Sequence, residues 1–219
     1  MCGRYTLGPD ARELVEMFDL PQLTFDYFAR YNIAPSQQAP IVAEDRRGRR
    51  MGLLTWGLVP SWMDEPGAGF INARGESVMT KPSFRQSFER RRCLVPADGF
   101  YEWRKEGDRR RPFWFYPVDG GVVSFAGIWD RWTRPGHEPR STFAILTTKA
   151  SDDVRHIHDR MPVVVSKPDR DLWLDRSSDP TEVGRLLRSA PSGTFAARKV
   201  SDRVNRAVED DPGLVEPLE

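Results

Sequence analysis

The second residue of the chain is a cysteine, and this position gives it a chemistry that an internal cysteine lacks. Removal of Met1 would leave Cys2 with a free α-amine beside its own thiol. The ordinary pKa values of these two groups are about 8 and about 8.5, so both are partly nucleophilic near neutral pH. Such a pair traps aldehydes, because the amine condenses to a Schiff base and the thiol then closes a thiazolidine ring intramolecularly. A cysteine that merely happens to stand second is the alternative interpretation.

Glu102 lies in the aromatic segment 100–103 and is a candidate for proton transfer. If this segment is a partly buried strand, its apolar surroundings disfavour the charged carboxylate and suit it to act as an acid or base. A glutamate on an edge strand that faces solvent would show the same pattern. The apolar neighbours favour the buried interpretation.

Two histidines, His156 and His158, would share one face if their segment were a strand. Histidine is the side chain best suited to move protons at neutral pH. A metal site would need more ligands, and the chain offers only two thiols and His137, which lies in a Pro/Gly loop. We therefore expect no metal and no cofactor. A structural histidine remains the alternative for either residue taken alone.

Polar and aromatic side chains elsewhere suggest contacts to a nucleic acid. Asn72 and Arg74 follow a short apolar run and could orient a nucleophile and hold a phosphate, although turn capping by Asn72 explains the pattern as well. Trp62 lies in a polar, Pro-flanked loop and is the best surface candidate for stacking on a base, with Phe84 as a second candidate.

The composition is that of a soluble globular protein, with 39% hydrophobic and 30% charged residues and a net charge of +1. Arginines cluster at 90–92 and 104–111, and a guanidinium pairs well with phosphate, although codon usage in a GC-rich genome explains the arginine bias equally well. No apolar run approaches the roughly 20 residues of a membrane span, and the amino terminus shows no signal-peptide pattern. The two cysteines do not indicate a disulfide framework. We expect a cytoplasmic protein.

Several predicted strands and few helices must position these residues. The pattern predicts helices at 10–19, where Asp10 and Glu13 form a capping box, and at 82–90, 169–174 and 180–188. Strands are expected at 53–59, 70–74, 92–96, 99–104, 112–117, 122–129, 141–148, 161–166 and 195–200. This order favours an α+β fold with a mostly antiparallel, barrel-like β-sheet and peripheral helices, in a single domain over residues 1–219.

Six segments resemble the SRAP family of abasic site processing proteins, in the family's order and over nearly the whole chain. They are Cys2-Gly3-Arg4, Tyr31-Asn32-Ile33-Ala34-Pro35, Trp56-Gly57-Leu58-Val59-Pro60 with Trp62, Ile71-Asn72-Ala73-Arg74, the run from Cys93 to Trp103, and His158-Asp159-Arg160-Met161-Pro162. The resemblance implies the SRAP fold and binding of single-stranded DNA that carries an abasic site, with junctions between single and double strands as a further expected substrate.

The resemblance also implies a reaction. Cys2 would condense with the aldehyde of the ring-opened sugar to form a stable thiazolidine DNA–protein cross-link that shields the lesion, with weak lyase activity and self-reversal. Asn72 would position Cys2 and the sugar, Glu102 would handle protons, and His158 would protonate the ring oxygen. DNA contacts are implied for Arg4, Arg74 and Thr147. We expect a monomer that associates with the nucleoid when it binds DNA.

Two other functions fit part of this pattern. A thiol peptidase could use Cys2 as an amino-terminal nucleophile with Glu102 and His158, acting on peptides or only on its own Met1. A non-covalent nucleic-acid-binding protein could carry Cys2 incidentally, and its affinity would then fall with salt but would not depend on this residue.

Overall fold

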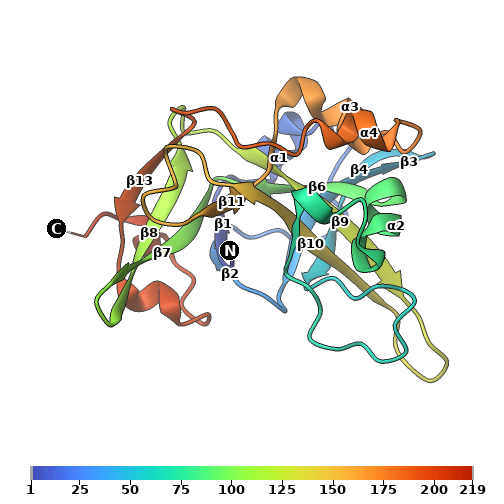
Figure 1. Ribbon diagram of the computed structural model, residues 1–219, viewed down its shortest axis with the longest axis horizontal. Coiled ribbons are helices and arrows are strands. Elements are labelled where there is room, and N and C mark those ends of the chain that lie inside the picture. Colours follow the sequence, from blue (N-terminus) through green and yellow to red (C-terminus); the bar gives the residue numbers. More distant parts are fainter. Residues whose placement is uncertain (1, 219) are drawn as a thin grey trace.

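Strands dominate the computed structural model, which describes residues 2–218 (Figure 1). They form two mostly antiparallel sheets with helices at the periphery, which confirms the expected α+β class with a barrel-like sheet. In the described part of the chain, no helix is both long and apolar enough to cross a membrane.

The first sheet positions the start of the chain. Its strand order is β13 (Phe195–Lys199), β8 (Arg109–Pro117), β7 (Gly99–Glu106), β1 (Tyr5–Leu7) and β2 (Arg30–Ile33), and all neighbours are antiparallel. Because β1 pairs with β7 in an antiparallel register, the residues just before β1 lie beside the middle of β7.

The second sheet closes into a ring. Its strands are β3 (Gln38–Asp45), β4 (Gly48–Trp56), β6 (Arg92–Ala97), β9 (Val123–Trp132) and β10 (Arg140–Lys149). They pair in the order β10–β4–β3–β6–β9, and β9 pairs with β10 to complete the ring. The contact of β10 with β4 is parallel, whereas the others are antiparallel.

Three short strands extend this ring near the end of β10. β5 (Asn72–Arg74) runs parallel to β10, β11 (Arg160–Pro162) runs antiparallel to it, and β12 (Val164–Val165) pairs with β9. Segments that are distant in sequence therefore meet beside the last residues of β10.

Helices cover the outside of the sheets. Helix α1 (Ala11–Met17) begins at the N-cap Asp10, and the expected capping box with Glu13 is present. Helix α2 (Pro82–Arg90) has a proline in its first turn and buries Phe84 and Phe88. The remaining elements are α3 (Arg170–Leu174), α4 (Pro180–Gly184) and the 3₁₀ turns η1 (Gly75–Ser77), η2 (Lys167–Asp169), η3 (Asp202–Asn205) and η4 (Pro212–Val215).

Aromatic side chains link the two sheets. Tyr5 of β1 packs edge-on against Trp56 of β4, with ring centroids 5.2 Å apart, and against Phe125 of β9. Trp56 in turn stacks on Phe143 of β10. All four rings are fully buried, so strand β1 and the residues before it are fixed against the ring of strands.

Most elements were predicted correctly in kind, and the differences have physical causes. The predicted strand 161–166 is divided at Val163, because this residue donates its N–H to Leu146 of β10 and accepts from Ala126 of β9. The chain crosses from one strand to the other at this point. The sequence pattern therefore predicted the extended conformation, but it did not predict that the chain changes its pairing partner from β10 to β9.

The strand predicted at 53–59 in fact begins at Gly48, and β3, with which it forms a hairpin, was not predicted. The first residues of β4 include two arginines, and this part of the sequence resembles a loop. Arg49 and Arg50 pair with Glu44 and Asp45 across the hairpin, which allows charged side chains in both strands. The predicted helix 180–188 is also shorter and ends at Gly184.

Candidate functional site

Cys2 is buried just before β1, next to β7. Its side chain is fully buried, and Sγ lies 3.8 Å from the carbonyl oxygen of Arg4, which also accepts the N–H of Tyr101 at 3.0 Å. Burial raises the pKa of the Cys2 thiol well above its usual range, and the nearby Glu102 carboxylate acts in the same direction. The thiol is therefore protonated at neutral pH. Met1, whose removal the prediction requires, lies outside the described residues.

Glu102 lies on β7 and is only 2% exposed, which confirms the expected burial and makes the solvent-facing alternative wrong. Burial raises the pKa of Glu102 to about 7 from its ordinary 4.5. Its protonated and ionised forms are consequently both well populated near neutral pH. A carboxyl group in this state can accept and return a proton within one reaction.

His158 follows the turns that connect β10 to β11, and its side chain is one quarter exposed. Its Nδ1 accepts the backbone N–H of Arg160 at 3.0 Å and also lies 3.1 Å from Oδ1 of the exposed Asp159; because the backbone N–H is a fixed donor, a neutral imidazole carries its proton on Nε2. Nε2 lies 3.9 Å from Oε2 of Glu102. Because burial also lowers the pKa of His158, the neutral ring is favoured, with its N–H directed toward the carboxyl group.

The expectation that His156 and His158 share a strand face is wrong, because residues 152–157 form turns. Side chains two residues apart lie on the same face of a strand, but this regular alternation does not apply to turns. Within residues 2–218, no group of three or more His, Cys, Asp and Glu side chains is arranged to hold a metal ion.

Asn72 joins β5 to the start of the chain. It lies opposite Ile145 in the parallel register with β10, and its Nδ2 donates to the carbonyl oxygen of Cys2 at 2.8 Å. The residue before it is fixed as well, because Trp56 Nε1 donates to the Ile71 carbonyl at 2.8 Å. Oδ1 of Asn72 is buried and accepts no hydrogen bond from residues 2–218. This oxygen can serve as an acceptor at the site.

Arg160 connects the segments that carry the other side chains, and sequence reasoning did not single it out. Its guanidinium binds both carboxylate oxygens of Glu76, at 2.6 and 2.9 Å, and donates to the carbonyl and hydroxyl oxygens of Thr147. The side chain of Thr147 is buried, so its hydroxyl faces Arg160. The available signal was the position of Arg160 two residues after His158.

Two arginines predicted to bind phosphate extend from the same segments. Arg74 ends β5 beside Thr147 and is exposed. Arg4 is partly buried, and one of its terminal nitrogens donates to the carbonyl oxygen of Val204 at 2.7 Å. Arg74 lies two residues after Asn72 and Arg4 lies two residues after Cys2, so each arginine extends from a segment that carries a site residue.

The predicted aromatic contacts differ in exposure. Trp62 is 56% exposed, whereas Phe84 is buried and packs edge-on against Phe70, which is 41% exposed. In this conformation Phe70 is the accessible ring of that pair. The loop between β4 and β5 carries Trp62 and closes at Gly69, whose φ is +74° and where a Cβ would lie 2.3 Å from the Gly57 oxygen.

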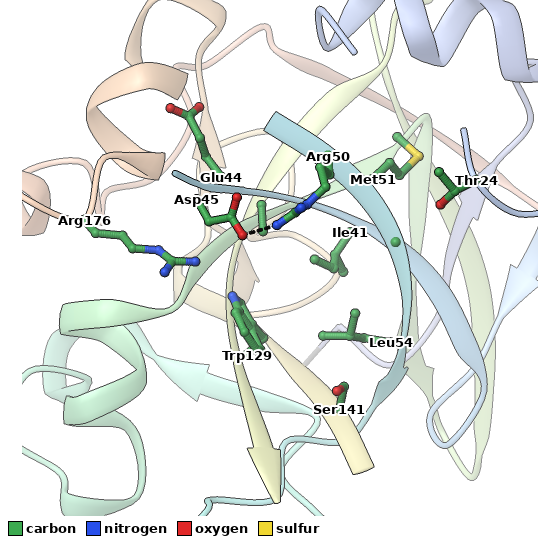
Figure 2. Close-up of a pocket in the computed structure, with 12 residues that line it drawn as sticks. Thr24, Ile41, Glu44, Asp45, Arg50, Met51, Leu54, Trp129, Ser141 and Arg176 are labelled. Carbon is green, nitrogen blue, oxygen red and sulfur yellow. Dashed lines mark hydrogen bonds and ion pairs between the residues drawn. The ribbon is translucent and has the colours of Figure 1, made fainter. Parts of the chain in front are cut away.

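A separate cavity of about 350 Å³ opens at the side of the ring of strands (Figure 2). None of the residues predicted for catalysis or DNA contact lines it. Its lining residues are Thr24, Ile41, Ala43, Glu44, Asp45, Arg50, Met51, Gly52, Leu54, Trp129, Ser141 and Arg176. Figure 2 shows that Asp45 and Arg50 at its rim pair with each other.

Comparisons with known proteins identify the family of the chain. A family model described as SOS response associated peptidase (SRAP) matches residues 1–207. The abasic site processing protein YoqW of Bacillus subtilis is 35% identical and the matched region covers 99% of both chains, and YedK of Escherichia coli is 29% identical over the full length of both. The chicken protein HMCES is 32% identical, over 88% of this chain and 67% of its own.

The fold comparison gives the same result. A crystal structure of a protein from Bacteroides thetaiotaomicron aligns with this chain over the full length of both, with a TM-score of 0.90 at 25% sequence identity. A family model that matches nearly the whole chain, together with relatives of similar length, leaves one assignment. The chain belongs to the SOS response associated peptidase (SRAP) family.

Proposed function

We propose that this protein captures abasic sites in single-stranded DNA by forming a thiazolidine between Cys2 and the aldehyde of the ring-opened sugar. Relatives from bacteria and vertebrates carry the name abasic site processing protein. The observation that carries the proposal is the convergence on Cys2. Asn72 binds its carbonyl oxygen at 2.8 Å, and its thiol lies in the field of Glu102, which faces His158.

The first step is attack of the amine on the aldehyde. Once Met1 is removed, the uncharged α-amine of Cys2 adds to the aldehyde carbon, and the resulting hydroxyl leaves as water to give a Schiff base. Addition moves one proton from nitrogen to the carbonyl oxygen, and loss of water moves a second proton from nitrogen to the resulting hydroxyl. Glu102, with a pKa raised to about 7 by burial, can do both near neutral pH.

His158 acts on the sugar before this attack. An abasic sugar is mostly a closed ring, and opening it requires a proton on the ring oxygen. A neutral imidazole is too weak an acid to give up this proton by itself, so the Nε2–H of His158 would donate a hydrogen bond to the ring oxygen while the protonated carboxyl group of Glu102, 3.9 Å from Nε2, supplies the proton. The buried Oδ1 of Asn72 would accept from the amine or a sugar hydroxyl and so hold the reacting groups in place.

Ring closure completes the reaction. Sulfur adds to the Schiff-base carbon, and the thiol proton ends on the ring nitrogen, so aldehyde and aminothiol give thiazolidine and one water without oxidation or reduction. The raised pKa of the buried Cys2 thiol keeps sulfur protonated until the amine has reacted. If closure is delayed, the Schiff base can instead cleave the strand, which is the weak lyase activity expected from the sequence.

Phosphate binding would hold the damaged strand. Arg4 and Arg74 are the proposed phosphate contacts and Trp62 the proposed stacking surface, while Thr147 would act through Arg160. We further propose that the protein works as a monomer and that it also binds lesions at junctions of single and double strands.

A thiol peptidase is the competing function. A thiol nucleophile must be ionised, and burial of Cys2 raises its pKa instead of lowering it. This environment favours the aldehyde reaction over attack on a peptide bond. Release of peptides from an unstructured substrate, lost in Cys2→Ala, would instead support the peptidase.

The decisive experiment mixes purified protein with a single-stranded oligonucleotide that contains one abasic site. We expect a slowly migrating band that survives heat and denaturant. Cys2→Ala should abolish it, whereas Cys93→Ala, which removes the other buried thiol, should retain it. Intact mass should show loss of Met1 before reaction. A cross-link that persists in Cys2→Ala would refute the proposal.

The order of the two steps needs its own test. Cys2→Ser, with Met1 removed, keeps the amine but has a poorer group for ring closure. Strand breaks should therefore rise relative to cross-links, and borohydride should trap a reduced amine adduct. Equal ratios of breaks to cross-links in both proteins would contradict an amine-first reaction.

A further inference from the structure

One buried side chain of another strand contacts the C-terminal segment 201–211 at several points. The segment contains a single short 3₁₀ turn, η3, among its described residues. Asn32 of β2 is fully buried, and the two hydrogens of its Nδ2 are shared among three carbonyl oxygens of this segment, those of Val204, Arg206 and Glu209, at 3.3, 3.1 and 2.8 Å. One amide therefore ties three points of this irregular backbone to β2.

A second contact fixes the same segment to β2. β2 is the last strand of its sheet, so its outer N–H groups need partners from elsewhere. Asp210 supplies them, because its Oδ1 accepts the backbone N–H groups of Tyr31 and Asn32 at 2.5 and 2.9 Å. Its other carboxylate oxygen pairs with Arg30. The segment and the edge strand thus satisfy each other.

This arrangement reaches the proposed DNA site through Val204. Its carbonyl oxygen accepts from Asn32 and also from a terminal nitrogen of Arg4, at 2.7 Å. The Val204 side chain is fully buried beside Tyr101, and Trp103 holds the adjacent Asn205 at 2.8 Å. The oxygen that orients Arg4 is therefore itself held in place.

Arg4 retains most of its capacity to bind. A guanidinium has five N–H donors, and within residues 2–218 the hydrogen bond to Val204 is the one that Arg4 makes through its side chain. A side chain already held at one donor loses less conformational freedom when the others bind an anion. The geometry is that of a cation arranged in advance beside Cys2.

We propose that Asn32 is a positioning residue for DNA binding, which acts through the Val204 carbonyl to hold Arg4 in the orientation that contacts a phosphate. This inference rests on the proposed function only for the identity of the ligand, a single-stranded DNA phosphate. Asn32 itself contacts neither DNA nor Cys2 and is not catalytic.

The test is a double-mutant cycle on binding of an undamaged single-stranded oligonucleotide, measured at several salt concentrations. Arg4→Ala should weaken binding about tenfold and make the slope of log Kd against log salt shallower by about 0.7, the value for one lost phosphate contact on a single strand. Asn32→Ala should change both quantities in the same direction. In the Arg4→Ala background, Asn32→Ala should change neither.

Controls separate positioning from loss of structure. Val208 lies in the same segment and is 82% exposed, so Val208→Ser should leave the affinity and the slope unchanged. The unfolding midpoint of Asn32→Ala should fall equally in both backgrounds, whereas its effect on binding should disappear without Arg4. Should Asn32→Ala fail to fold, Asp210→Asn keeps the shape of the anchor and should show the same pattern more weakly.

Two results would overturn the inference. One is a folded Asn32→Ala or Asp210→Asn protein with unchanged affinity and slope, and the other is a full additional loss of binding in the Arg4→Ala background. Cross-linking to abasic DNA at saturating concentration is measured separately. If no cross-links form but Asn32→Ala still has no effect on binding in the Arg4→Ala background, only the proposed chemistry is refuted. If cross-links form but the effects of Asn32→Ala and Arg4→Ala on binding add up, only the positioning role is refuted.

Discussion

Replacing Glu102 by glutamine should stabilise the protein at alkaline pH and abolish its reaction. Burial raises the pKa of Glu102 from 4.5 to about 7, so the folded protein binds a proton more tightly than the unfolded chain does. Stability therefore falls as the pH rises from 4.5 through 7. The gap is about 2.5 pH units, and at about 1.4 kcal/mol per unit the ionised form costs about 3 kcal/mol.

This cost depends on pH, which makes it measurable. Below pH 4.5 the carboxyl group is protonated in both states and the two proteins should be equally stable. At pH 6 the variant should be more stable by about 2 kcal/mol, and above pH 8 by about 3 kcal/mol. The side chain is only 2% exposed, so little of the effect is lost to solvent screening.

Urea unfolding at a series of pH values between 4 and 8.5 gives the required difference, because groups away from the site titrate alike in the two proteins and burial keeps the Cys2 thiol protonated throughout this range. Glu65→Gln, at an exposed loop position, is the matched control and should differ from the parent by less than about 0.5 kcal/mol at every pH. A difference between Glu102→Gln and the parent that does not change with pH would refute the argument from burial.

Three further predictions concern the surroundings of the site. Trp56→Phe keeps an aromatic side chain but removes one of the two donors to the Ile71 carbonyl, which still accepts the N–H of Ile145, so urea unfolding should show a loss of about 0.5–1.5 kcal/mol for the hydrogen bond, and an unchanged midpoint would contradict it. A lysine at position 160 cannot reproduce the two hydrogen bonds from Arg160 to the Glu76 carboxylate, so Arg160→Lys should lower the free energy of unfolding by about 1–2 kcal/mol and slow cross-linking at saturating DNA. Full cross-linking activity in this variant would argue against a role of the Arg160–Glu76 pair in holding the site. Cys93 is fully buried and its thiol pKa is raised, so in a Cys2→Ala protein a thiol reagent at pH 8 should label it only as fast as the protein opens, and rapid labelling of the native protein would disagree.

Local signals account for the elements that sequence reasoning located well. The capping box of Asp10 and Glu13 and the proline at the start of α2 are contacts within one turn, so the sequence contains all the information needed. The burial of Glu102 was likewise predictable, because its neighbours in β7 are large and apolar.

Features that depend on distant segments could not be predicted. Asn32 reads as an ordinary polar residue in a short strand, and its three acceptors come from a segment about 170 residues further along the chain. Phe84 was assigned to the surface although α2 turns this ring inward against Phe70. Which face of a helix or strand is buried depends on the packing of the whole fold, and this packing cannot be predicted from the local pattern of a single sequence.

Burial has the same effect on each ionisable group of the site, and this common direction favours one order of events. It raises the pKa of the Cys2 thiol and of Glu102 and lowers that of His158, so the uncharged form of each is favoured. An environment of this kind also favours the uncharged form of an amine, which is its nucleophilic form. In the proposed reaction the thiol, in contrast, would stay protonated until the Schiff base has formed beside it. Burial would therefore disfavour early attack by the thiol, the stronger nucleophile, and favour attack by the uncharged amine. A reaction that begins at nitrogen and ends at sulfur requires this order.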